Sequence, residues 1–200
     1  MKQALITGAS SGIGEAIYNG LKKKGWNCIG TSRRGPDLRY DVTSGPIETS
    51  MTFDLVIHCA GIMPFNDSKM TMDVNFWGTW NILTGVVHNI VDNGCVIIIA
   101  SISGMQAESD LPIYAASKAA VISLTKSIAK RWARHIRVNC ISPGFFKTNL
   151  VPGDTPEELL ATVPMGYEED PKHLVNLILS IEDSKYMTGS NIVIDGGSLL

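Results

Sequence analysis

Short apolar segments alternate with longer amphipathic segments along most of this 200-residue chain. The short segments are rich in β-branched residues, and several are apolar almost throughout, as in parallel strands that are covered on both faces. The longer segments repeat apolar residues at spacings of three and four, which is typical of helices. This alternation predicts an α/β fold, a doubly wound parallel sheet (Rossmann fold) of about seven strands with helices on both faces and right-handed crossovers. The expected strands are Ala4–Thr7, Asn27–Thr31, Leu38–Val42, Asp54–Cys59, Cys95–Ala100, Ile136–Ile141 and Asn191–Ile194.

One connection does not fit the alternation. Between Arg33 and Asp41 there is no room for a crossover helix, and Gly35-Pro36 indicates a turn. Because a parallel crossover usually takes about a dozen residues or more, either this connection is unusually short or the third strand is rudimentary.

Composition excludes several classes of protein. The chain has 17 basic and 19 acidic residues, so its formal net charge of −2 argues against binding to nucleic acid. No apolar run approaches the ~20 residues that span a membrane, and the N-terminus lacks the apolar core of a signal peptide. The four cysteines and four histidines have no metal-binding or redox spacing. We therefore expect residues 1–200 to form a single domain of a cytoplasmic protein, with no metal, nucleic-acid or membrane partner.

A glycine-rich turn follows the first expected strand and opens a helix. Its sequence is Thr7-Gly8-Ala9-Ser10-Ser11-Gly12-Ile13-Gly14. Glycines let the backbone approach a pyrophosphate closely, and the helix N-terminus offers amides and a positive dipole to it. The lysine of a nucleoside triphosphatase phosphate loop is absent, which disfavours ATP hydrolysis. The turn predicts a dinucleotide site.

Tyr114 and Lys118 lie four residues apart, which places them on one face of a helix. A free tyrosine has a pKa of about 10, and a neighbouring ammonium lowers it, so the pair can act as a general acid. Tyr18 and Lys22 share this spacing, and we interpret them as a solvated helix face. Ser101 distinguishes the two pairs, because it ends a strand 13 residues before Tyr114, at the sheet edge where ligands bind.

Taken in order, these motifs resemble the short-chain dehydrogenase/reductase family, which pairs a TGxxxGxG turn with a Ser…YxxxK set. The resemblance covers nearly the whole chain. Further matching segments are Asp41-Val42 (an adenine-contacting pair), Cys59-Ala60-Gly61 (the end of the family's NNAG), Asn75 (a helix-kink asparagine), Pro143-Gly144 with Thr148 (beside the nicotinamide), and Thr188-Gly189 through Asp195-Gly196-Gly197 (the last strand and its exit).

The resemblance implies roles for individual residues. Ser101 would hydrogen-bond the substrate oxygen, and Tyr114 would be the acid in reduction and the base in oxidation. Lys118 would lower the pKa of Tyr114 and hold the nicotinamide ribose, and Asn75 would hold a water that links Lys118 to solvent. The implied cofactor-binding residues are Gly8, Ser10, Ser11, Gly12, Ile13, Gly14, Ser32, Arg33, Arg34, Asp41, Val42, Cys59, Ala60, Gly61, Tyr114, Lys118, Pro143, Gly144, Phe146 and Thr148.

The sequence departs from the family pattern at two places. His58 and Cys59 replace the two asparagines of NNAG, which bears on the bracing of the central strands more than on chemistry. The family's lid region, here Asn149–Met165, is short and rich in proline, so we expect an open or small lid. The candidate substrate contacts are then Met63, Met105, Phe145, Phe146 and Val151, most of which could equally be core residues.

The end of the second strand indicates the choice of cofactor. An acidic side chain about 20 residues beyond the glycine turn selects NAD by bonding the adenosine ribose. Here Ser32, Arg33 and Arg34 end the strand, and Arg33 can offer a planar fork of donors to a 2′-phosphate. Asp37 is the nearest acid, and Gly35-Pro36 should turn it away. The sequence therefore favours NADP over NAD.

These observations predict an oxidoreductase that transfers a hydride between NADP(H) and a small carbonyl or alcohol substrate. The alternative is a non-catalytic dinucleotide-binding regulator or scaffold of the same fold, which the complete Ser–Tyr–Lys set disfavours. A third hypothesis is an epimerase or lyase, whose C-terminal region is usually longer. The resemblance also implies a homodimer or homotetramer formed through the helices Met70–Val91 and Ile113–Ala133. The candidates to be partly exposed in a monomer are Trp77, Trp80, Val87 and Trp132.

Overall fold

The computed structural model describes residues 1–64, 66–148, 150 and 155–200. Within these residues, seven strands form one sheet in the order β3-β2-β1-β4-β5-β6-β7, and all neighbouring strands pair in parallel. The predicted doubly wound α/β fold is confirmed. The strands are β1 (Gln3–Thr7), β2 (Asn27–Ser32), β3 (Leu38–Arg39), β4 (Phe53–His58), β5 (Ile90–Ile99), β6 (Ile136–Pro143) and β7 (Asn191–Ile194).

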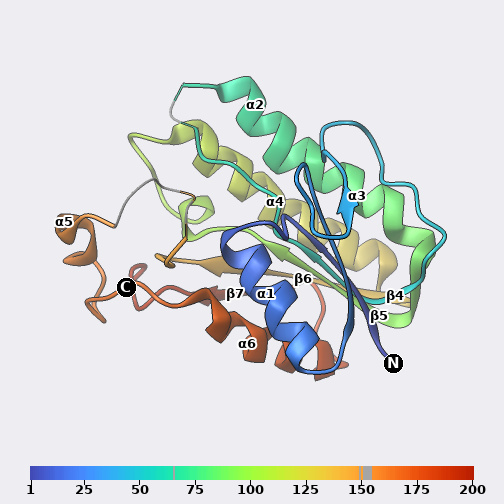
Figure 1. Ribbon diagram of the computed structural model, residues 1–200. Helices are drawn as coiled ribbons and strands as arrows, with labels where there is room; N and C mark the ends of the chain where they lie inside the picture. The colour runs from blue at the N-terminus through green and yellow to red at the C-terminus, as the bar shows by residue number, and fades with distance from the viewer. Residues whose placement is uncertain (65, 149, 151–154) are drawn as a thin grey trace.

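Helices cover both faces of the sheet (Figure 1). On one face lie α1 (Gly12–Lys23) and α6 (Leu174–Asp183). The other face is covered by α3 (Gly78–Val86) and α4 (Pro112–Trp132). The shorter elements are α2 (Ser68–Met72), α5 (Glu157–Leu160), the π-helical turn η1 (Asp73–Trp77) and the 3₁₀ turns η2 (Val87–Asn89), η3 (Ile102–Gly104) and η4 (Pro171–His173).

Successive residues of each central strand enter different halves of the core. In β1, Ala4 and Ile6 pack toward α1 and α6, whereas Leu5 packs toward α3 and α4. All three side chains are 1% exposed or less. Since both faces are covered, a polar residue in the middle of a strand would lose its water without gaining a partner. This requirement explains why Cys95–Ile99 of β5 is apolar, and why the buried polar residues Arg137 and Asn139 of β6 hydrogen-bond to backbone carbonyls.

The third strand is rudimentary and shorter than the predicted Leu38–Val42. It contains two residues, with Leu38 paired to Thr31 and Arg39 to Ser32. The chain then leaves the sheet, because Ser44 donates its amide to the Asp41 carbonyl in a turn (3.0 Å). The connection from β2 to β3 has no helix and spans only residues 33–37. The short connection predicted from the sequence is therefore present.

The predicted helix Met70–Val91 is interrupted and ends early. A π-helical turn, η1, separates α2 from α3, and the helical backbone stops at Asn89. Ile90 and Val91 instead begin β5, where Ile90 pairs with Phe53. Apolar residues continue from the helix into β5, so their periodicity did not show where the helix ends.

Only Lys22 of the predicted solvated pair Tyr18 and Lys22 is exposed. Tyr18 is only 7% exposed and belongs to the core under α1. Its hydroxyl donates to Asp37 Oδ1 (3.2 Å), and Lys22 Nζ donates to the same hydroxyl (3.1 Å). Our interpretation of Tyr18 was wrong because the β2–β3 connection, which has no helix of its own, folds back against α1.

Candidate active site

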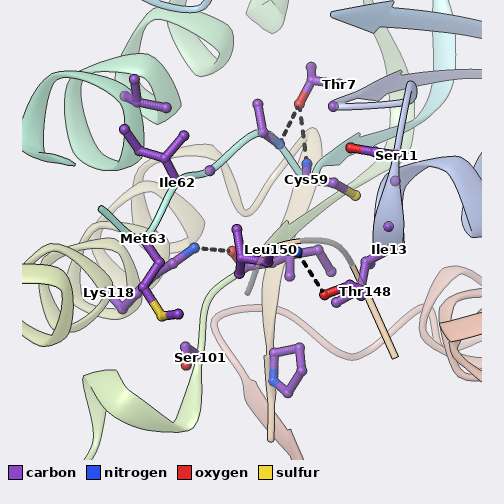
Figure 2. A pocket seen from close by; sticks show the side chains of 18 of the residues that line it. Thr7, Ser11, Ile13, Cys59, Ile62, Met63, Ser101, Lys118, Thr148 and Leu150 are labelled. Atoms are coloured by element: carbon purple, nitrogen blue, oxygen red, sulfur yellow. Dashed lines mark hydrogen bonds between the residues drawn. The ribbon is translucent and has the colours of Figure 1, made fainter. Parts of the chain in front are cut away.

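One cavity of about 1040 Å³ lies at the carboxyl ends of β1, β2, β4, β5 and β6. In Figure 2, Lys118 and Ser101 lie toward one end of it, with Ser11 and Ile13 across from them. Asn75 is absent from the residues that line it. All the other predicted site residues line it, namely Gly8, Ser10, Ser11, Gly12, Ile13, Gly14, Ser32, Arg33, Arg34, Asp41, Val42, Cys59, Ala60, Gly61, Ser101, Tyr114, Lys118, Pro143, Gly144, Phe146 and Thr148.

The glycine turn is held tightly against the exit of β4. Gly8 has a φ of +67°, and a Cβ added there would lie 2.9 Å from the Ala60 amide nitrogen. The hydroxyl of Thr7 accepts hydrogen bonds from the amides of Cys59 (3.1 Å) and Ala60 (3.2 Å) (Figure 2). Glycine is therefore required at position 8 by both conformation and space.

His58, the last residue of β4, also contacts Thr7 at this junction. Its Nδ1 lies 2.7 Å from the Thr7 hydroxyl. Because that hydroxyl already accepts two amides, its proton points to Nδ1, and the ring proton sits on Nε2. Burial, together with the positive charge of Lys118, lowers the pKa of His58 to about 3. Within the described residues Nε2 has no hydrogen-bond partner. The neutral ring of His58 therefore bonds Thr7 through Nδ1, and its Nε2–H has no acceptor.

Tyr114 projects from the first turns of α4 and is 7% exposed. Burial raises the pKa of Tyr114, hydrogen bonding with Ser101 acts against the rise, and the negative charge of Glu108 adds to it. Ser101 lies two residues after β5, and its hydroxyl accepts the Ser103 amide of η3 (3.2 Å). The structure thus places two hydroxyl groups together at the sheet edge and keeps Tyr114 protonated at neutral pH.

Lys118 lies one turn after Tyr114 and is also buried. Its Nζ donates to the carbonyl of Ile99 (3.1 Å) and lies 5.7 Å from the centre of the Tyr114 ring. Burial lowers the pKa of Lys118 to about 8. Burial is the largest influence on the pKa of Tyr114 and raises it, so the lowering by Lys118 that the resemblance implied stays a prediction.

Asn75 sits in the π-helical turn η1, beside the cavity wall. Its Oδ1 accepts the Ile62 amide and its Nδ2 donates to the Ile62 carbonyl, both at 2.9 Å. Nδ2 also donates to Ser117 Oγ of α4 (3.0 Å). A Cβ at Gly61 would lie 3.3 Å from Lys118 Nζ and 3.4 Å from Asn75 Oδ1. The side chain of Asn75 therefore fixes the wall of the cavity next to Lys118.

The far end of the cavity is formed by the ends of β2 and β3. Arg33 and Arg34 are exposed there. Asp41 accepts the amide of Thr43 (2.9 Å), and this bond, with Arg33 nearby, holds the pKa of Asp41 below its usual value. Thr31 is among the lining residues, but its hydroxyl is buried away from the cavity surface and has no hydrogen-bond partner among the described residues.

The expected substrate contacts are only partly assembled. Met63, Phe145 and Phe146 line the cavity, and Val151 lies outside the described residues. Met105 was a wrong choice, because it lies outside the described lining and its Sδ accepts from Asn191 Nδ2 (3.1 Å). The sequence analysis missed other lining residues, including Thr31, Ser103, Gln106, Glu108 and Leu150. Ser103, Gln106 and Glu108 follow the end of β5, and that position was the available signal for them.

Two further findings concern the described residues alone. No helix among them is long and apolar enough to cross a membrane. They also contain no group of three or more His, Cys, Asp or Glu side chains arranged to hold a metal ion.

The family model described as enoyl-(acyl carrier protein) reductase matches residues 41–198. The oxidoreductase UcpA of Salmonella typhimurium is 31% identical over 249 aligned positions, which cover 100% of this chain and 95% of that protein. The chain is a short-chain dehydrogenase/reductase. It accordingly belongs to the NAD(P)-dependent oxidoreductases, as its motifs predicted.

Two solved structures share the fold of this short-chain dehydrogenase/reductase. The NADP active-site complex of RhlG from Pseudomonas aeruginosa has a TM-score of 0.85 at 26% identity, covering 100% of this chain and 96% of that one. A 4-hydroxyisoleucine dehydrogenase complexed with NADH has a TM-score of 0.86 at 26% identity, covering 99% and 98%. The two structures hold different nicotinamide dinucleotides, so similarity to them does not distinguish NADP from NAD as the cofactor.

Proposed function

We propose that this enzyme transfers a hydride between NADP(H) and a small carbonyl or alcohol substrate by Ser-Tyr-Lys catalysis. The observation that carries this proposal is the position of Ser101, Tyr114 and Lys118 on the wall of the cavity that the glycine turn also lines. A protein that only binds a dinucleotide has no need of a buried lysine beside a buried tyrosine, since burying both groups is costly.

The described residues fit a dinucleotide. The glycine turn exposes backbone at a helix N-terminus, where a pyrophosphate binds. Ser32, Arg33 and Arg34 line the adenosine end of the cavity. Lys118 and Thr148 line the nicotinamide end that the resemblance implies. A bound nicotinamide dinucleotide supplies or accepts the hydride.

The residues at the catalytic end handle the proton. In reduction, Tyr114 donates its proton to the substrate oxygen while Ser101 hydrogen-bonds the same oxygen. Burial and Glu108 keep the pKa of Tyr114 high, so the proton is present on the phenol at neutral pH. Lys118, with a pKa near 8, is mostly charged at pH 7 and stabilises the phenolate that forms when the proton leaves. Asn75 positions the adjoining wall and acts indirectly.

Preference for NADP(H) is supported by the charges at the end of β2. Arg33 and Arg34 line the cavity there. The nearest carboxylate, Asp37, is occupied, because its Oδ2 accepts the Gly30 amide (2.7 Å) and its Oδ1 accepts from Tyr18. Asp41 also lines this end near Arg33, but its Oδ1 accepts the amide and hydroxyl of Thr43. Arg33 and Arg34 are therefore the groups offered to a ribose 2′-phosphate.

The substrate assignment stays at the level of a small carbonyl or alcohol. Met63 and Phe145 offer apolar surface in the cavity, and Gln106 and Glu108 offer polar groups. The predictions of one domain over residues 1–200, a cytoplasmic location and a homodimer or homotetramer are part of this proposal.

Loss of NADPH absorbance against a panel of ketones and aldehydes tests the proposal. Turnover with at least one carbonyl compound is the expected result. Binding of NADPH without turnover across the panel would favour the regulator or scaffold, and rearrangement without net cofactor consumption would favour an epimerase or lyase. The Tyr114→Phe variant on the same panel shows whether any turnover belongs to this site.

A further inference from the structure

The connection between β2 and β3 is held by side-chain bonds in place of a helix. It spans residues 33–37, whereas a parallel crossover usually takes about a dozen residues or more. It carries Arg33 and Arg34 at the edge of the cavity. A short connection with exposed cations needs other contacts to fix its course.

Asp37 supplies the closing contacts. Its amide donates to the Gly30 carbonyl (3.2 Å), and its Oδ2 accepts the Gly30 amide (2.7 Å). One residue thus satisfies both backbone groups of Gly30, which a longer third strand would otherwise pair. A hydrogen bond from an amide to a carboxylate is stronger than one between neutral groups.

The second oxygen of Asp37 ties the connection to α1. Tyr18 donates its hydroxyl to Oδ1 (3.2 Å), and Lys22 donates to the Tyr18 hydroxyl (3.1 Å). Packing reinforces these bonds, because a Cβ at Gly30 would lie 2.7 Å from Pro36 Cγ and 2.9 Å from Tyr18 Cδ2. The connection therefore rests directly on β2 and α1, with no space between them.

The other end of the turn is fixed by Ser32. Its hydroxyl accepts the Arg34 amide, and its carbonyl accepts the amides of Gly35 and Tyr40, all at 3.0 Å. The two arginines lie between this anchor and the one at Asp37. Loss of either anchor frees the backbone that carries them.

We propose that Asp37 is a positioning residue for cofactor choice, which fixes the turn that presents Arg33 and Arg34 to a 2′-phosphate. The carboxylate that would select NAD if it faced the ribose is here bonded to Gly30 and Tyr18, and it supports the opposite choice. This inference rests on the proposed preference for NADP(H).

Dissociation constants for NADPH and NADH, measured by fluorescence titration, test the inference without a known substrate. The Asp37→Ala variant is expected to weaken NADPH binding about tenfold, because the turn loses its charged acceptor, and to change NADH binding much less. Asp37→Asn should recover most of the loss, since the amide oxygen can still accept the Gly30 amide. Tyr18→Phe should give a smaller loss in the same direction.

Asp54 provides the matched control. Its Oδ2 also accepts a strand amide, that of Gln3, at 2.7 Å, but at the amino ends of β1 and β4, away from the cavity. Asp54→Ala should leave the ratio of the two dissociation constants unchanged. An Asp37→Ala variant that weakens both cofactors equally, or that matches Asp54→Ala, would overturn the inference.

Hydrogen–deuterium exchange separates this inference from the proposed cofactor preference. In the free enzyme, Asp37→Ala is expected to speed exchange in peptides that cover residues 28–40, and unchanged exchange there would show that Asp37 does not hold the turn. A wild type that binds NADH as tightly as NADPH would overturn the cofactor preference even if exchange rises. Faster exchange together with an unchanged ratio of dissociation constants would show that Asp37 holds the turn, and would overturn the inference that Asp37 affects cofactor preference.

Discussion

The two ends of the cavity are built in different ways. Ser101 follows the long central strand β5, and Tyr114 and Lys118 share the first turns of α4, so regular backbone sets their spacing. At the other end, Arg33 and Arg34 sit on a connection without a helix, held by Asp37 and Ser32. The catalytic end is rigid because of its secondary structure, whereas the adenosine end depends on a few side-chain bonds. A point mutation should therefore stop chemistry at one end and alter selectivity at the other.

The largest expected effect is at the catalytic end. Tyr114→Phe keeps the ring but removes the proton donor, so kcat should fall by about 10²–10⁴-fold while NADPH still binds. Steady-state kinetics and an NADPH titration check both halves of this prediction. Tyr18→Phe is the control, because it removes a buried hydroxyl from α1 and should leave kcat near the wild-type value. A Tyr114→Phe variant that retains more than about a tenth of kcat would refute the assignment.

The next effect is at the adenosine end. Arg33→Ala should lower the ratio of kcat/KM for NADPH to that for NADH by about tenfold or more, because a charged bond to the 2′-phosphate is lost. Arg39→Ala removes a neighbouring exposed arginine that is absent from the described lining, and it should not shift the ratio. A wild type that prefers NADH, or an unchanged ratio in Arg33→Ala, contradicts the proposed specificity.

The junction between the two ends should be sensitive to acid. His58 has a folded-state pKa of about 3 against an ordinary value of 6.5. Below pH 6.5 the unfolded chain binds a proton at this residue and the folded chain does not, so stability falls as the pH drops from 6.5 toward 3. The contribution of one such group is at most about 1.4 kcal/mol per pH unit.

Urea unfolding across this pH range measures the effect. The free energy of unfolding of His58→Asn should fall less steeply with acid than that of the wild type, because asparagine does not titrate. Equal pH slopes for the two proteins would show that His58 is not buried in its neutral form.

The smallest effect on catalysis is expected from the surface beside η1. Trp77 is 53% exposed. Met70 of α2 is 47% exposed, and Ile113 of α4 is 38% exposed. We expect light scattering to give a multiple of the 21.6 kDa chain mass, and Trp77→Ala to lower it with kcat little changed. Tyr186→Ala, which removes another exposed aromatic residue, is the control. A single 21.6 kDa species at micromolar concentration would contradict the predicted assembly.

The sequence predicted the regular parts of the molecule well. The residues Cys95–Ile99 of β5 are apolar and buried as predicted, and β7 (Asn191–Ile194) has the predicted bounds. The glycine turn and the Tyr114–Lys118 pair could be placed because local spacing alone puts them at a helix start and on a helix face. Boundaries were less accurate, since apolar periodicity runs from α3 into β5 without a break.

The remaining features depend on contacts between distant segments. Spacing alone could not separate Tyr18 from Tyr114, because burial of Tyr18 is caused by the connection that folds back from β2. The hydrogen bonds of Asn75 to Ile62 and Ser117 likewise join three separate segments. The pKa of Tyr114 depends on how deeply α4 packs, which no residue spacing records.

Because Arg33 and Arg34 are exposed, cofactor binding should depend on ionic strength. Attraction between exposed charges is screened over about 8 Å in physiological salt and over about 3 Å in molar salt. Binding of a 2′-phosphate at these arginines should weaken as salt is added, whereas proton transfer at the buried Tyr114 should not. Ionic strength should therefore act as a graded control on which dinucleotide this enzyme uses, with concentrated salt narrowing the difference between NADPH and NADH.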